Sequence, residues 1–157
     1  GERNAHNHKE LTYRTHCGFV LNAAYEVGNF FQDQLEYLHL PFQDFADQQG
    51  AMAAALNRTL AFIDRARAHN SSVLVHCVAG ISRSSTIVMN YLIQREGWTL
   101  KRAYNHVLKL RPIIRPNAGF FKELQRVERE VHGGCNTMSM EDYMALEEGQ
   151  TKIAAFS

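Results

Sequence analysis

The chain has 157 residues, of which 45% are apolar and 21% charged, a composition that suits one globular domain with a substantial core. Its 17 lysines and arginines against 16 aspartates and glutamates exclude the strongly basic surface of a dedicated nucleic-acid binder. No apolar run approaches the roughly 18 residues of a membrane span, and no signal peptide is recognised. Neither nucleic acid nor a membrane is therefore an expected partner.

Cysteine usage points to a reducing compartment. The three cysteines, Cys17, Cys77 and Cys135, are an odd number at unrelated spacings, so a disulfide framework is not expected and at least one thiol is free. The expected location is the cytoplasm, with the nucleus as an alternative.

The first half of the chain predicts two short strands and one helix. The compact apolar run at residues 18–23 is typical of a buried strand, and residues 35–40 form a second strand candidate that stops at Pro41. Apolar residues then recur at three- and four-residue steps from Met52 to about His69, which indicates one face of an amphipathic helix. Only a weak helical pattern, near residues 9–13, precedes these elements.

The second half predicts a strand, a loop and three helices. Val73 to Cys77 is the strongest strand candidate and is expected to be central and buried. Helical patterns follow at residues 84–93, 99–110 and 117–132. This alternation predicts an α/β fold: a central, mostly parallel sheet of about four or five strands flanked by helices.

Beyond Gly134 the composition changes, because residues 135–157 carry four carboxylates against one lysine. We expect a globular domain over residues 1–134 and an acidic C-terminal tail, in which Ser139-Met140-Glu141-Asp142 has the pattern of a capped short helix. An ordinary appendage is the simplest interpretation. The alternative is that the apolar residues of this helix dock on the body, or on a second copy of the chain, through Met140, Tyr143, Met144 and Leu146.

One segment carries a chemically specific pattern, His76-Cys77-Val78-Ala79-Gly80-Ile81-Ser82-Arg83-Ser84. It places a cysteine at the end of a strand, then a glycine-bearing loop, then an arginine at the start of a helix. Backbone N–H groups of such a loop can point inward, and the helix N-terminus adds unpaired donors and a positive dipole end. The planar guanidinium can grip two oxygens of a tetrahedral phosphate. The sequence therefore predicts a phosphate-binding loop between the strand and the helix, with Cys77 as a thiolate at neutral pH.

A single cysteine in a strand is usually a small buried residue without chemistry. Here, however, a histidine, a cysteine, a glycine, an arginine and a hydroxyl residue all stand at fixed places, a chance match rarer than about one in a million per start position. The strand, loop and helix context is also the one that such a motif requires. A nucleophile facing bound phosphate is therefore the favoured interpretation.

This segment resembles the signature of the cysteine-dependent protein phosphatases, and His-Cys-x-x-Gly-x-Ser-Arg-Ser of their dual-specificity branch stands intact at residues 76–84. The resemblance covers most of residues 9–131, including residues 19–24, Leu40-Pro41-x-x-Asp44 and Arg115-Pro116-Asn117-x-x-Phe120. Two features depart from the family pattern: the strands that usually precede the Asn22-Ala23 segment are short or missing, and the tail from Cys135 lies outside the match. The resemblance implies that residues 1–134 are the catalytic domain, and no cofactor is expected.

The resemblance also implies a role for each signature residue. Cys77 would attack phosphorus in line to form a phosphocysteine intermediate, while Arg83 and the loop amides hold the equatorial oxygens. Ser84 would donate to the sulfur as it leaves. His76 is expected to support the loop through hydrogen bonds, because alternation along a strand points it away from Cys77. The residues assigned to the loop amides are Val78, Ala79, Gly80, Ile81 and Ser82.

The leaving oxygen of a phosphate ester needs a proton donor. The family pattern Pro-x-x-Asp points to Asp44, and Asp47 in the same loop is the competitor. Either aspartate could instead act only as a turn or helix-capping residue.

The substrate class follows from what the loop lacks. Residues 78–82 include no lysine or arginine, so the extra charge expected for highly phosphorylated inositol lipids or RNA 5′ ends is missing. Phosphorylated proteins are the expected partners, and the resemblance implies activity on phosphotyrosine together with phosphoserine or phosphothreonine. A phosphoprotein-binding module without catalysis is the alternative.

Two further groups of residues receive simpler interpretations. The basic stretch at residues 95–116 is interpreted as a solvated helix face, with a basic rim that attracts acidic phosphopeptides as the alternative. A His-x-His pair and a His-Cys pair fit none of the common zinc spacings, so no metal site is expected at His6, His8, His16 and Cys17.

Overall fold

The structure, a computed structural model, describes residues 17–156. The weak helical pattern near residues 9–13, and His6, His8 and His16, lie outside the described residues. The described strands are β1 (Cys17–Asn22), β2 (Glu36–His39) and β3 (Ser72–His76). The helices are the short 3-10 helix η1 (Ala46–Gln48), α3 (Gln49–Ala68), α4 (Arg83–Glu96), α5 (Leu100–Leu110), α6 (Ala118–His132) and α7 (Met140–Phe156).

The three described strands form a parallel sheet in the order β2-β1-β3. Asn22 at the end of β1 lies opposite His39 of β2 and His76 of β3, so all three strands end at the same edge. The predicted α/β class and parallel sheet are confirmed, with three strands in the described part of the chain where about four or five were expected. Loops that follow β1, β2 and β3 are thereby gathered at one edge, and open parallel sheets bind ligands at the carboxyl ends of their strands.

The position of β3 differs from the prediction. It was expected to be central and buried, but β1 is the middle strand and most of β3 is half-buried. The reason is that apolar residues after Arg83 recur at helical spacing, so every later described element is a helix and none pairs with the outer edge of β3.

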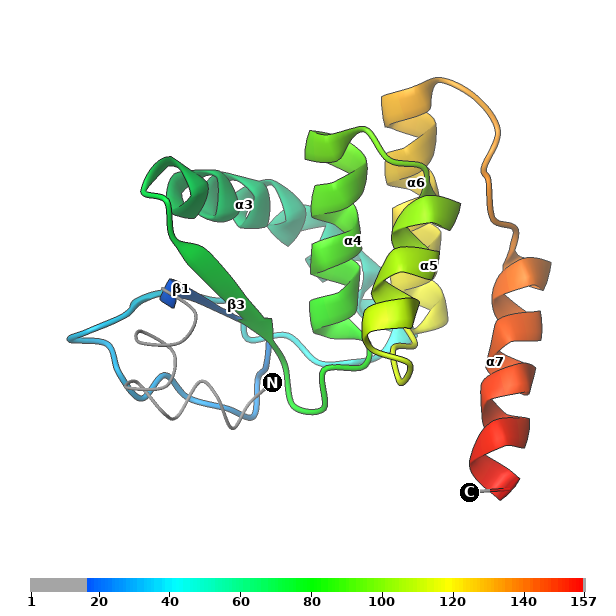
Figure 1. Cartoon of the computed structure of the whole chain (residues 1–157), viewed down its shortest axis with the longest axis horizontal. Coiled ribbons are helices and arrows are strands. Elements are labelled where there is room, and N and C mark those ends of the chain that lie inside the picture. Colours follow the sequence, from blue (N-terminus) through cyan, green and yellow to red (C-terminus); the bar gives the residue numbers. More distant parts are fainter. Residues whose placement is uncertain (1–16, 157) are drawn as a thin grey trace.

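The sheet is apolar on both faces, as expected for a parallel sheet covered on two sides. Phe19 and Leu21 pack into the main core with α3 and α4, while Val20 packs with Cys17 and Leu35 in a smaller cluster on the other face. Helices α3, α4, α5 and α6 gather on one side of the strands, and α7 stands at the end of the molecule farthest from them (Figure 1).

The predicted helix boundaries are confirmed by their caps. The Thr99 side chain accepts a hydrogen bond from the N–H of Arg102 at 3.2 Å, and the Asn117 side chain accepts one from Phe120 at 2.9 Å. Gly97 and Gly133 adopt the left-handed conformation, with φ of 68° and 65°, that ends a helix without the steric cost of a Cβ. No helix within residues 17–156 combines the length and the apolar character needed to cross a membrane.

The tail helix is longer and better anchored than the sequence suggested. Ser139 and Asp142 cap it reciprocally, at 2.9 and 3.0 Å, and it continues for 17 residues where a short helix was expected. Its Tyr143 is only 4% exposed, stacks on Phe121 of α6 with ring centroids 4.5 Å apart, and donates its hydroxyl proton to the carbonyl of Pro116. The helix therefore docks on the body of its own chain, whereas the domain boundary at residue 134 and self-association stay predictions.

We predict that Tyr143→Ala lowers the free energy of unfolding by about 3 kcal/mol, because it removes a buried, stacked ring and leaves a cavity against Phe121. Urea denaturation measures the change. The matched control is Met144→Ala on the same helix, because Met144 is 53% exposed and its truncation should cost less than about 0.5 kcal/mol. Equal losses in the two variants would show that Tyr143 does not anchor the helix.

Candidate active site

A cavity of about 350 Å³ opens where β3 ends, and its lining joins residues from three loops: Glu26, Asp44, Cys77, Val78, Ala79, Ile81, Ser82 and Arg83. The structure thus brings Cys77, Arg83 and Asp44 around one space. Asp47, the competing acid, lies exposed in η1 and is not part of this lining.

The carbonyl groups of residues 79–82 are all held from outside the cavity. The Arg111 side chain donates to the carbonyls of residues 79 and 80 at 2.8 and 2.9 Å. The backbone N–H of Arg115 donates to the carbonyl of residue 81 at 2.8 Å. The backbone N–H of Thr86 donates to the carbonyl of residue 82 at 3.0 Å. Four successive carbonyls therefore point away from the cavity.

The amide groups of the loop point the other way. In a planar trans peptide the N–H lies opposite the carbonyl of the preceding residue, so outward carbonyls turn the following N–H groups inward. The outward carbonyls of residues 79–82 thus direct the N–H groups of residues 80–83 inward, and within the described part of the chain no N–H of residues 80–82 donates a hydrogen bond. Gly80 makes this path possible with a φ of +66°, which other residues rarely adopt. A concave row of inward N–H groups is an arrangement suited to an anion, and anion binding by this loop stays a prediction.

Arg83, the first residue of α4, is buried and fixed at one end of its guanidinium. Its Nη1 donates to the carbonyl of Phe42 at 3.0 Å and to the Glu26 carboxylate at 2.9 Å. Its Nε is buried and has no hydrogen-bond partner among the described residues. A buried charged donor without a partner is costly, so this edge of the guanidinium suits an anion that enters the cavity.

Glu26 is a site residue that the sequence analysis missed. Desolvation is the largest single influence on its pKa and acts to raise it, but the hydrogen bond from Arg83, a backbone hydrogen bond at Glu26 and the charge of Arg83 together outweigh desolvation. The pKa therefore lies below the usual glutamate value, and Glu26 is anionic at neutral pH. The signal that could have found it is topological: Glu26 follows β1, and a loop after one parallel strand meets the loop after its neighbour at the same sheet edge.

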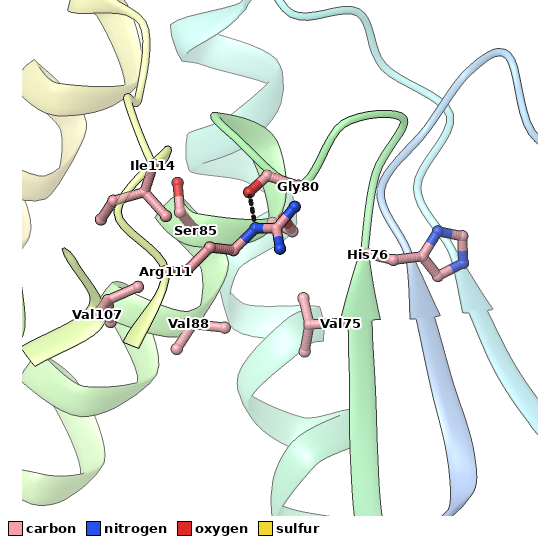
Figure 2. Close-up of a pocket in the computed structure, with 9 residues that line it drawn as sticks. Val75, His76, Gly80, Ser85, Val88, Val107, Arg111 and Ile114 are labelled. Atoms are coloured by element: carbon pink, nitrogen blue, oxygen red, sulfur yellow. Dashed lines mark hydrogen bonds between the residues drawn. The ribbon is translucent and has the colours of Figure 1, made fainter. Parts of the chain in front are cut away.

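Cys77 is 2% exposed, and its Sγ lies 3.4 Å from the Oγ of Ser84, which is close enough for a hydroxyl to donate to sulfur. His76 is equally buried, with its Nδ1 3.3 Å from the carbonyl of Cys77. Its ring points away from the loop and from Arg111 (Figure 2). The supporting role expected for His76 stays a prediction.

Asp44 is exposed at the mouth of the cavity, where its carboxylate accepts a hydrogen bond from the Asn117 side chain at 2.8 Å. The backbone N–H of Asn117 donates to the Oγ of Ser82 at 2.9 Å, and its side-chain oxygen caps α6. One residue thus ties the aspartate to the anion-binding loop. The sequence analysis had given Asn117 no function. No group of three or more histidine, cysteine or acidic side chains within residues 17–156 is placed to hold a metal ion.

We predict that the cap and the aspartate contact of Asn117 can be separated by substitution. Asn117→Ala removes both and should lower the free energy of unfolding by about 1 kcal/mol, the usual cost of a lost N-cap. Asn117→Ser keeps a capping oxygen and removes only the donor to Asp44. It should therefore lower the free energy of unfolding by only a few tenths of about 1 kcal/mol. Urea denaturation distinguishes them, and equal losses would mean that the aspartate contact, not the cap, stabilises this segment.

Comparison with known proteins gives a consistent result. Residues 1–130 match the family model described as dual specificity phosphatase, catalytic domain. The chain is 40% identical over 124 residues to protein phosphatase Slingshot homolog 3 of Rattus norvegicus, an alignment that covers 79% of this chain and 19% of the rat protein. The chain therefore spans about a fifth of the length of that relative.

Solved structures share the fold. A putative mouse dual specificity phosphatase, complexed with zinc tungstate, superposes with a TM-score of 0.75 at 28% identity, covering 83% of this chain and 80% of that one. The human tyrosine phosphatase-like serine/threonine/tyrosine-interacting protein gives a TM-score of 0.74 at 28% identity, covering 83% of this chain and 89% of that one.

Proposed function

The chain belongs to the dual specificity phosphatase family, and we propose that it hydrolyses phosphotyrosine and phosphoserine or phosphothreonine in proteins through a phosphocysteine intermediate. The observation that carries the proposal is the arrangement around one cavity of a buried cysteine, a carboxylate and an arginine whose buried Nε has no partner among the described residues. The names of the Slingshot relatives, as protein phosphatases, support proteins as the substrates.

In the first step the Cys77 thiolate attacks phosphorus and the bond to the ester oxygen breaks. Asp44 gives its proton to that leaving oxygen, which would otherwise depart as an unstable alkoxide. The Nε edge of Arg83 and the amides of the loop at residues 78–82 hold the equatorial oxygens, where negative charge is spread in the transition state. The contacts of Nη1 with Glu26 and the Phe42 carbonyl fix the guanidinium before substrate arrives.

In the second step water attacks phosphorus and the bond to sulfur breaks. Asp44, now a carboxylate, takes the proton from water, and Cys77 leaves as a thiolate. The Ser84 hydroxyl, 3.4 Å from the sulfur, donates to the charge that returns there. His76 is a positioning residue in this scheme, since it contacts the loop backbone at Cys77 and points away from the loop.

A phosphoprotein-binding module without catalysis is the second candidate. The structural likeness to a protein described as phosphatase-like and as an interacting protein favours it. The same cradle would hold the phosphate in either case, so only turnover separates the two functions. We also propose a cytoplasmic or nuclear location, because three free cysteines suit a reducing compartment.

The test of the nucleophile uses an aryl phosphate, with phosphotyrosine and phosphothreonine peptides next. We expect turnover by the wild type and, after acid quenching, one phosphoryl group on the peptide that contains Cys77. Cys77→Ser should reduce kcat by at least about 10³-fold. Cys135→Ser, at an exposed cysteine, is the matched control and should retain full activity. Binding of phosphopeptides by wild type without turnover would establish the binding module instead.

The acid assignment predicts a dependence on the leaving group. Asp44→Asn should reduce kcat by about 10²–10⁴-fold with phosphoserine or phosphothreonine peptides, whose alkoxide leaving groups need a proton. The loss should be smaller for an aryl phosphate with an acidic phenol. Asp47→Asn is the control, because Asp47 does not line the cavity, and its kcat should stay within about twofold of wild type. The assignment is wrong if Asp47→Asn shows the leaving-group dependence and Asp44→Asn does not.

A further inference from the structure

Arg111 lies outside the signature but contacts the back of the anion-binding loop. It follows α5 directly, and its backbone N–H donates to the carbonyl of Val107 at 2.8 Å. Its side chain then turns under the loop, where Nε donates to the Gly80 carbonyl at 2.9 Å (Figure 2). Its Nη2 also donates to the Ala79 carbonyl, at 2.8 Å. One guanidinium thus holds two successive peptide groups.

These two contacts fix the direction of two amides that face the cavity. The carbonyl of Ala79 shares a peptide plane with the N–H of Gly80, and the carbonyl of Gly80 shares one with the N–H of Ile81. Because both carbonyls are drawn outward onto Arg111, both N–H groups are turned toward the space beside Cys77. Charge-assisted hydrogen bonds to a carbonyl also polarise its peptide group, which makes the opposite N–H a better donor.

The position of the Arg111 guanidinium depends on the absence of a side chain at residue 80. A Cβ at residue 80 would lie 2.8 Å from the Arg111 Nη2, so the guanidinium would have to shift, and 3.1 Å from its Nε, which is a tight contact. The glycine in the signature is therefore needed for the close approach of the arginine as well as for its φ of +66°.

Arg111 is an exposed residue that lies beside an apolar hollow. A small hollow of about 130 Å³ behind the loop has apolar walls that include Val75, Val88, Val107 and Ile114, with Arg111 beside them. Its alkyl stem can lie along these walls while its charged head meets the two carbonyls, which is the usual way a long basic side chain covers apolar surface.

We propose that Arg111 is a positioning residue for phosphate binding, which acts through the peptide groups of Ala79 and Gly80 and does not touch the substrate. This proposal rests on the proposed function of the cavity. It replaces, for Arg111, both sequence interpretations of the basic stretch at residues 95–116, a solvated helix face and a rim for acidic peptides. A rim residue would affect only long acidic substrates, whereas a residue that orients the cradle affects the smallest anion equally.

The test measures the Kd of inorganic phosphate for the whole chain by NMR titration. Arg111→Met keeps an apolar stem and removes both donors, so we expect binding about tenfold weaker, and the amide shifts of Gly80 and Ile81 on adding phosphate should shrink. Arg111→Lys keeps the charge but cannot serve both carbonyls with a fork, and should be intermediate. Lys109→Met, an exposed residue of α5 with the same change in charge, is the matched control and should bind like wild type.

Three outcomes overturn the proposal: phosphate binding by Arg111→Met within twofold of wild type, an equal loss in Lys109→Met, or unchanged Gly80 and Ile81 shifts. A double-mutant cycle shows whether the effect of Arg111 passes through residue 80. Gly80→Ala should displace the guanidinium, so adding Arg111→Met to it should weaken binding less than Arg111→Met does alone. If wild type binds phosphate but hydrolyses no ester, the proposed function fails. The ratio of the phosphate Kd of each variant to that of wild type still decides the role of Arg111.

Discussion

The site depends on the outward direction of four carbonyls in the loop between β3 and α4. A short loop with every carbonyl turned outward is unfavourable unless each carbonyl finds a donor, because an unpaired peptide group loses its hydrogen bonds to water. The chain supplies these donors from α4, from Arg115 and from Arg111. The inward amides follow from the planarity of the peptide and need no further interaction. The proposed binding of an anion therefore depends on hydrogen bonds on the side of the loop that faces away from the cavity.

The parallel sheet supplies the second requirement, which is a fixed arginine. Since β1 and β3 end at the same edge, the loop after β1 places Glu26 against Arg83, and the segment after β2 adds the carbonyl of Phe42. Both groups accept hydrogen bonds from the same nitrogen of Arg83, Nη1. An arginine held this way keeps one edge for the cavity and loses little conformational entropy when an anion binds.

The sequence predicted the parts of the site that are local and missed the parts that are distant. The strand, the loop, Gly80 and the start of α4 lie within a few residues of Cys77, so spacing and propensity suffice to place them. Glu26, Arg111 and the Asn117 contact with Asp44 join residues separated by 31 to 73 positions, and their pairing depends on how helices and loops pack. The basic stretch at residues 95–116 shows the consequence, because charge counting alone could not distinguish a residue in solvent from one that holds a backbone. The edge position of β3 was missed for the same reason, since strand order is a property of the assembled sheet.

The segment at residues 115–117 connects the two halves of the proposed chemistry. The Arg115 N–H holds one loop carbonyl, while Asn117 holds both the Ser82 hydroxyl and the Asp44 carboxylate. From the other side, α7 holds this segment through Tyr143 on Pro116 and through Glu147 on Arg115, whose Nε lies 2.9 Å from the carboxylate. A displacement of the segment would therefore move the acid and the cradle together. A two-step phosphoryl transfer needs this coupling, because the same aspartate must protonate the leaving oxygen and later activate water at a phosphorus that stays in the cradle.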